Sequence, residues 1–197
     1  MRAFQPLAFL LLLAGSTALL AEPPRVPYQV GERLSKAPAS PTANFREVTW
    51  EQLIPPNWNP ADAFKGFDLA KMQDADPRAM DALARMRDAW ANAPAEPSLN
   101  GAAIRIAGFA IPLERIKGEV REFLLVPYFG ACIHVPPPPA NQIIYVLSDK
   151  PLKDMQSMDA IWVSGLLKVS AGDSSWGRSA YRLQASVIAP YALPGSK

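Results

Sequence analysis

Cysteine and histidine are the scarcest residues in this sequence, since the 197 residues contain one of each, Cys132 and His134. A single cysteine cannot form a disulfide within the chain, so the fold is not stabilised by one. In an oxidising compartment a lone thiol is buried, bound to a metal or paired with another molecule. No second histidine is present to act as a base elsewhere, and no Ser-His-Asp arrangement can be placed.

A strong charge of either sign is also missing. The chain has 20 Lys and Arg against 18 Asp and Glu, which is no electrostatic footprint for nucleic acid. The same balance argues against tight binding to an acidic membrane surface. Gly172 and Gly177 match no glycine pattern that cradles phosphates.

A long hydrophobic run is absent too. Residues 7–21 read LAFLLLLAGSTALLA after Arg2, and this run is shorter than the roughly 20 apolar residues of a spanning helix. A positive start, an apolar middle and small residues at the end predict a cleaved signal peptide over residues 1–21. Cleavage can follow Ala18 or Ala21, and an uncleaved membrane anchor is the alternative. The prediction is therefore a periplasmic or secreted protein with no stable membrane insertion after cleavage.

Proline marks the next boundaries. Five prolines fall in residues 22–44, which predicts an extended linker with little capacity for packing. Residues 45–191 are enough for a single domain, and residues 192–197 are a C-terminal tail. Thr49 and Gln52 fit a capping box for a short helical turn. Asp76-Pro77 begins the clearest helix, whose stripe of Met80, Leu83, Met86 and Trp90 indicates core packing.

Short strands separated by turn residues follow Gly101. They are predicted at residues 104–111, 119–126, 142–147, 161–169 and 181–187, with a helical turn within residues 148–160. This order matches a mainly β (α+β) fold, an OB-like five-stranded antiparallel barrel or curled sheet with an N-terminal helix packed on it. An open antiparallel sheet with the helix laid across one face is the competing arrangement.

Candidate chemistry lies between the second and third strands. If Ala131–Val135 is extended, Cys132 and His134 point to the same face, about 6.6 Å apart along the strand. Thiolate and imidazole are ligands that zinc prefers, so the pair is a candidate metal site with two of its ligands. Equally, the thiol can be a buried structural group, or a nucleophile activated by the nearby imidazole. No catalytic residue is assigned.

A run of four prolines follows, Pro136, Pro137, Pro138 and Pro139. Prolines lack the backbone N–H of a central strand, so the run predicts a stiff polyproline arch. Together with Tyr128, Asn141 and Gln142 this arch is a candidate surface for a ligand or a partner. The Ser170–Ser179 segment, with Trp176 and Arg178, is a weaker candidate, and its Gly, Ser and Asp residues favour a solvated hairpin loop.

Several blocks of the sequence resemble the exported bacterial family of unknown function DUF3299. They are Gly108–Leu113, Phe123–Pro127, Gly130–Pro139 with Asn141-Gln142, Trp162–Gly165 and Tyr181–Leu183. The resemblance implies an exported or lipid-anchored protein, and some members accompany metal-uptake systems. It therefore favours a periplasmic metal-handling accessory protein that binds zinc through Cys132 and His134, with metal-uptake components or another periplasmic protein as partner. A non-catalytic module that docks a protein or small ligand at the proline arch, and a thiol-dependent enzyme, are the alternatives.

Overall fold

The computed structural model of the chain describes residues 28–34, 44–67, 77–135 and 137–191. The predicted leader over residues 1–21, the Asp76 cap, Pro136 and the tail at 192–197 lie outside the described residues. The elements, in chain order, are β1 (Arg46–Glu47), η1 (Trp50–Leu53), η2 (Pro60–Phe64), α1 (Pro77–Ala91), η4 (Pro97–Leu99), β2 (Ala103–Pro112), β3 (Glu119–Val126), η5 (Ala140–Gln142), β4 (Ile144–Lys153), β5 (Asp159–Ser174) and β6 (Gly177–Pro190).

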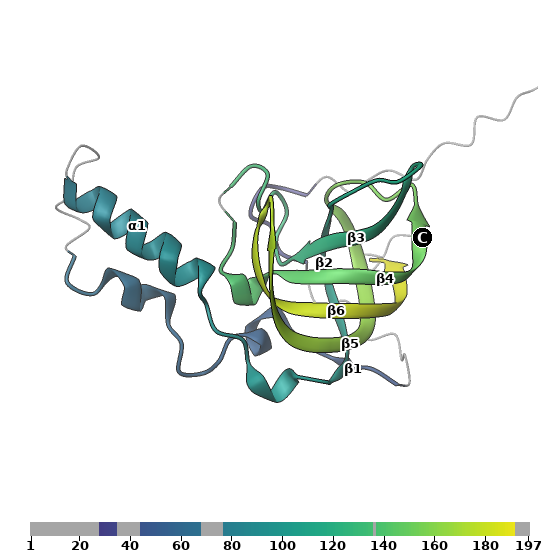
Figure 1. Cartoon of the computed structure of the whole chain (residues 1–197), viewed down its shortest axis with the longest axis horizontal. Coiled ribbons are helices and arrows are strands. Elements are labelled where there is room, and N and C mark those ends of the chain that lie inside the picture. The colour runs from purple at the N-terminus through teal and green to yellow at the C-terminus, as the bar shows by residue number, and fades with distance from the viewer. Residues whose placement is uncertain (1–27, 35–43, 68–76, 136, 192–197) are drawn as a thin grey trace, which may run out of the picture.

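Five strands close into a barrel (Figure 1). Strand β2 pairs antiparallel with both β3 and β5, which closes the ring. The β3–β4 and β5–β6 pairs are antiparallel, whereas β4 and β6 run parallel. The short β1 adds to β2 in parallel. The predicted OB-like barrel and its five strands are confirmed, and β1 is the strand that the sequence did not indicate.

The barrel interior follows from the alternation of apolar residues along the strands. Ile104, Ile106 and Ala110 of β2 lie in the interior cluster, with side chains from the other barrel strands. Gly108 continues the same row, and a Cβ there would lie 2.9 Å from the ring of Trp50. The Trp50 Nε1 donates to the carbonyl of Ala107 at 2.7 Å. The missing side chain therefore makes room for the η1 tryptophan against β2.

The connection between β4 and β5 differs from the prediction. Strand β4 continues to Lys153, and in the described chain residues 154–158 form turns rather than a helical segment. Asp154 and Met158 have positive φ angles of 59° and 67°. Such left-handed residues reverse the chain within a few positions, so the strands take up the residues that the sequence assigned to a helical turn.

A second apolar layer covers the outside of β2, β3 and β4. Phe109, Ile111, Leu124 and Val126 point outward and are buried by residues from 28–34 and from 127–143. The rings of Tyr28 and Phe129 lie 5.0 and 5.6 Å from that of Phe109, edge-on as aromatic pairs prefer. Residues 28–34, which the sequence placed in a linker, thus pack on the barrel.

The predicted helix is confirmed as α1, Pro77–Ala91, with Arg85 and Asp81 paired at 3.0 Å on its exposed face. It lies against η2 and meets the barrel near β6, so most of it projects to one side (Figure 1). Ala82 is its buried residue, and Met80 is 61 % exposed. The Met/Trp stripe therefore does not enter the barrel core. None of the helices within the described ranges is long and apolar enough to cross a bilayer.

Candidate functional site

Cys132 and His134 lie in a tight turn that follows β3. The carbonyl of Gly130 accepts hydrogen bonds from the backbone N–H groups of Ile133, His134 and Val135, at 3.3, 2.8 and 3.3 Å. Gly130 and Cys132 both have positive φ angles, 82° and 63°. The extended conformation considered for Ala131–Val135 is therefore replaced by a turn, because the chain finds its hydrogen bonds locally ahead of a proline run that offers none.

The two side chains of the candidate metal pair lie in different environments. Cys132 is partly buried and packs against the outer apolar layer, and this burial raises the pKa of its thiol to about 11. His134 is exposed. In the described ranges, no three His, Cys, Asp or Glu side chains come close enough together to hold a metal ion. The turn thus presents one imidazole and one protonated thiol.

The raised pKa of Cys132 is evidence against the hypothesis of a thiol-dependent enzyme. The thiolate is the nucleophile, and a pKa of about 11 leaves about one thiol in ten thousand ionised at pH 7. A cysteine nucleophile needs the opposite shift, toward a lower pKa. The environment of Cys132 therefore favours a packing role for the thiol over catalysis.

Tyr128 joins the turn to the N-terminal segment. It forms an antiparallel bridge with Arg33, whose guanidinium carbon lies 5.8 Å from the centre of the tyrosine ring. Burial, and then the proximity of Cys132, raise the pKa of Tyr128. The next residue, Phe129, exchanges backbone hydrogen bonds of 2.9 Å with Gly31 and Glu32. The base of the turn is therefore held by residues 31–33.

The described part of the proline run begins at the tip of the β5–β6 hairpin. Pro137 is exposed and lies over Gly177, where an added Cβ would come within 3.2 Å of the proline Cβ. Pro138 is buried and Pro139 partly so. Within this segment Pro137 is thus the proline most open to a partner. The hairpin itself is strand to Ser174 and again from Gly177, so the loop predicted for residues 170–179 is reduced to a two-residue turn.

Asn141 and Gln142 have interior positions. Asn141 Nδ2 donates to the carbonyl of Pro94 at 3.0 Å, and Gln142 Nε2 donates to that of Trp50 at 2.8 Å. Both side chains are buried, at 0 % and 6 % exposure. They fasten η5 to the segments that precede the barrel, and a ligand at the surface would not reach them without displacing these contacts.

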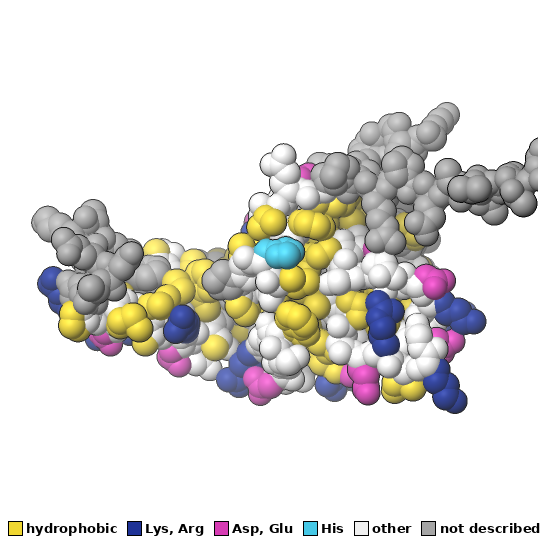
Figure 2. Space-filling model, turned by 90° about the horizontal axis from the view of Figure 1, so that it is seen from above, with side chains coloured by type: hydrophobic (Ala, Val, Ile, Leu, Met, Phe, Trp, Pro, Cys, Tyr) yellow, Lys and Arg dark blue, Asp and Glu magenta, His cyan; other side chains and the backbone are white. Residues whose placement is uncertain are grey.

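Exposed apolar side chains surround the turn. Val30 is 54 % exposed and Ile133 is 38 % exposed. A Cβ built on Gly130 would lie 3.2 Å from Val30 Cγ1 and 3.5 Å from His134 Cδ2, so both side chains lie over this glycine. Figure 2 shows the imidazole among hydrophobic side chains. We call Val30, Ile133 and His134 the turn surface.

Val30 is the residue of this surface that sequence reasoning missed. It lies in a proline-containing segment with few large apolar residues, which is typical of a linker. The signal that could have found it is the local pattern Tyr28, Val30 and Leu34, an apolar cluster inside an otherwise polar stretch. This cluster packs on the apolar outer faces of β2 and β3, and the sequence alone does not show that contact.

The chain is similar to known proteins of one family. The model of the family described as "Protein of unknown function (DUF3299)" matches residues 50–190. The chain belongs to the DUF3299 family. A crystal structure of a DUF3299 family protein from Pseudomonas aeruginosa PAO1 is 38 % identical, covering 77 % of this chain and 99 % of that one, with a TM-score of 0.60. No protein of curated function matches. Membership of the DUF3299 family thus agrees with the barrel fold, and it does not indicate a chemical reaction.

Proposed function

We propose that this DUF3299 protein is an exported, non-catalytic binding module, and that it docks a protein partner through the turn surface. The observation that carries the proposal is that the exposed side chain of Val30 lies with His134 over Gly130, while the exposed Ile133 precedes His134 in the same turn. Scattered exposed apolar residues are ordinary. Here Val30 and the turn come from segments about a hundred residues apart, and backbone hydrogen bonds of Phe129 with Gly31 and Glu32 join the two segments.

Rigidity supports a docking role. The turn is fixed by three hydrogen bonds to one carbonyl, and its base is tied to Gly31 and Glu32. A surface that is already ordered loses little conformational entropy when a partner binds. The exposed imidazole of His134 adds a polar group that can orient a partner beside the apolar contact.

A position-specific crosslinking experiment tests this. Benzoylphenylalanine replaces Ile133 in one strain and Ile116, which is 63 % exposed in the β2–β3 connection, in a control strain. We expect one defined protein adduct from position 133 and none from position 116. The purified partner should bind the wild-type protein, and Val30→Asp should weaken binding at least tenfold, since a charge at a desolvated contact is costly. Equal adducts at both positions, or unchanged binding by Val30→Asp, would refute the proposal.

A second candidate is periplasmic metal handling, with zinc held by Cys132 and His134. It is favoured by one observation, that both potential ligands come from the same hydrogen-bonded turn and that one of them is exposed. A closed zinc site has four ligands, so a partner such as a metal-uptake component would supply the others.

Zinc titration of the purified protein, alone and with its crosslinked partner, tests the metal candidate. Binding that is lost in both Cys132→Ser and His134→Ala supports it, and half-stoichiometry points to a site shared by two copies. Zinc content equal to that of the two variants, in reduced and folded protein, rules it out. The docking proposal is unaffected by that outcome, because its test uses Val30 and Ile133.

A further inference from the structure

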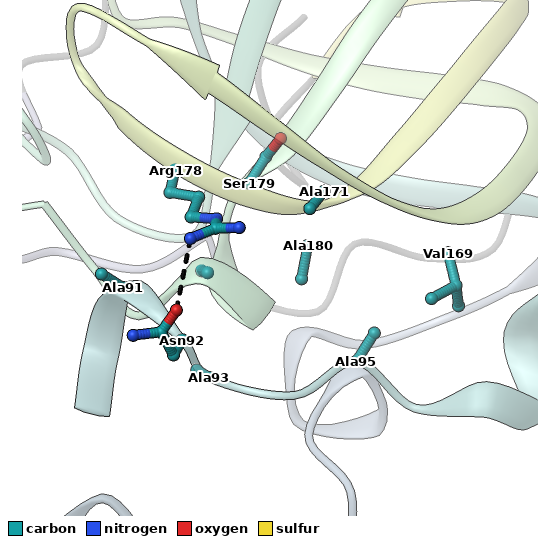
Figure 3. A pocket seen from close by; sticks show the side chains of 10 residues that line it. Ala91, Asn92, Ala93, Ala95, Val169, Ala171, Arg178, Ser179 and Ala180 are labelled. Atoms are coloured by element: carbon teal, nitrogen blue, oxygen red, sulfur yellow. Dashed lines mark hydrogen bonds between the residues drawn. The ribbon is translucent and has the colours of Figure 1, made fainter. Parts of the chain in front are cut away.

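A small cavity lies on another part of the molecule, between the end of α1 and the β5–β6 hairpin (Figure 3). Its volume is about 210 Å³, and six of its ten lining residues are alanine. The chain from Ala91 to Ala95 forms one wall, and the hairpin forms the other. Ala93, Ala140 and Ala180 are buried, whereas the rim is exposed. The cavity thus has an apolar floor and an open mouth.

Size limits what this cavity can hold. A cavity of about 150 Å³ accommodates benzene, and drug-sized ligands occupy sites of about 300–1,000 Å³. At about 210 Å³ the space fits a ligand, or the end of a chain, of roughly six to ten non-hydrogen atoms.

The polar groups at the cavity rim indicate which charged or polar group a ligand would carry. Arg178 lies at the rim, where its Nη1 donates to Asn92 Oδ1 at 3.2 Å. Its Nε lies 3.7 Å from Asp173 Oδ1, a carboxylate whose side chain is 84 % exposed. Such an exposed ion pair contributes about 0–1 kcal/mol, so a ligand anion can replace it. Ser179, between Arg178 and Ala180, points to the other side of the strand, where its buried hydroxyl donates to the Gly172 carbonyl at a long 3.3 Å.

Two buried polar atoms without a hydrogen-bond partner belong to residues next to the lining residues Ala91 and Ala140. Asn141 follows the lining residue Ala140. Its side-chain amide donates to the carbonyl of Pro94, which lies in the chain between the lining residues Ala93 and Ala95. Its Oδ1 is buried without a hydrogen-bond partner among the described residues, as is the Nε1 of Trp90, which precedes Ala91. Buried polar atoms of this kind are rare in folded proteins. They mark this corner as the part of the described structure whose hydrogen bonding is incomplete.

We infer that this cavity binds a carboxylate carried on a short aliphatic group. The guanidinium of Arg178 takes the carboxylate, since it matches that geometry with two parallel N–H donors. The alanines and Val169 contact the aliphatic part. Two sources share this chemistry: a free short-chain acid, and the C-terminal alanine of a peptide. The inference is independent of the turn surface, because no residue of that surface lines the cavity.

NMR titration of the ¹⁵N-labelled protein tests the inference, with butyrate, Gly-Ala-Ala and the uncharged butyramide as probes. We expect saturable shifts at the amides of Ala93 and Ala180 with a carboxylate probe, in the millimolar range typical of ligands of this size. Arg178→Gln should weaken binding about tenfold or more. Ala171→Leu should block it by filling the rim, at an exposed position that tolerates the change. Arg182→Gln, on the same strand, is the matched control and should bind as the wild type.

The outcomes separate cleanly. Tighter binding of butyrate assigns a free acid, and tighter binding of Gly-Ala-Ala assigns a peptide terminus. Butyramide binding as strong as butyrate, or the absence of saturable shifts with either acid, would overturn the inference. Equal weakening by Arg178→Gln and Arg182→Gln would also overturn it, because a general charge effect would then explain the binding.

Discussion

The thiol of Cys132 should react slowly with iodoacetamide at neutral pH. Burial raises its pKa from the ordinary value of 9.0 to about 11. At pH 7 the thiolate fraction is then about one in ten thousand, against about one in a hundred for an unshifted thiol. Because only the thiolate attacks, alkylation of the folded protein should be about 100-fold slower than alkylation of the same residue in urea.

The assay follows mass increase with time at pH values from 7 to 10. Every thiol adduct reports Cys132, because the chain has no other cysteine. In the folded protein the logarithm of the rate should rise by about one for each pH unit over the whole range, since the pKa lies above it. In urea the rise should level off near the ordinary pKa. Equal rates in the two states at pH 7, or a plateau below pH 8 in the folded protein, would refute the reasoning and restore the thiol-dependent enzyme.

Two predictions concern the barrel. Gly165→Ala should lower the free energy of unfolding by at least about 3 kcal/mol in urea titrations, because the new Cβ would lie 2.0 Å from the Gln184 carbonyl oxygen. Its control, Gly101→Ala, meets no atom within 4 Å at φ 79° and should cost only about 1–2 kcal/mol. Comparable losses would contradict the clash. Tyr181→Phe removes a donor 2.7 Å from the Leu53 carbonyl, and the same titration should show a loss of about 1–3 kcal/mol. An unchanged midpoint would mean that this buried bond contributes nothing.

The barrel could be predicted because its signal is periodic. Ile104 and Ile106, and the alternation from Tyr181 to Ala185, place inward residues at every second position. What the alternation cannot show is the outer layer. Leu124 and Val126 are apolar on the face away from the barrel interior, and the sequence gives no indication of what covers them. They are covered by side chains that include Tyr28, Leu34 and Phe129, and this contact depends on packing between distant segments.

Prediction of the site was limited by backbone geometry. The proximity of Cys132 and His134 in the sequence showed that they belong to one feature. It could not show that Gly130 accepts three hydrogen bonds and reverses the chain there. The helix illustrates the same limit: the spacing of Met80 and Trp90 predicted α1, but its main neighbour is η2 rather than the sheet. Local pattern defines an element, while its partners are decided by the whole fold.

The outer layer has a consequence for the order of folding. Gly31 and Phe129 exchange a backbone hydrogen bond although they are about a hundred residues apart, whereas the β5–β6 hairpin joins neighbours in the chain. Closing the longer loop costs more chain entropy, so the hairpins can form first and residues 28–34 can join afterwards. Such late, peripheral contacts are also the first to open in the native state. The surface that we expect a partner to cover would then be completed last and exposed earliest, and binding there would slow the opening of that layer.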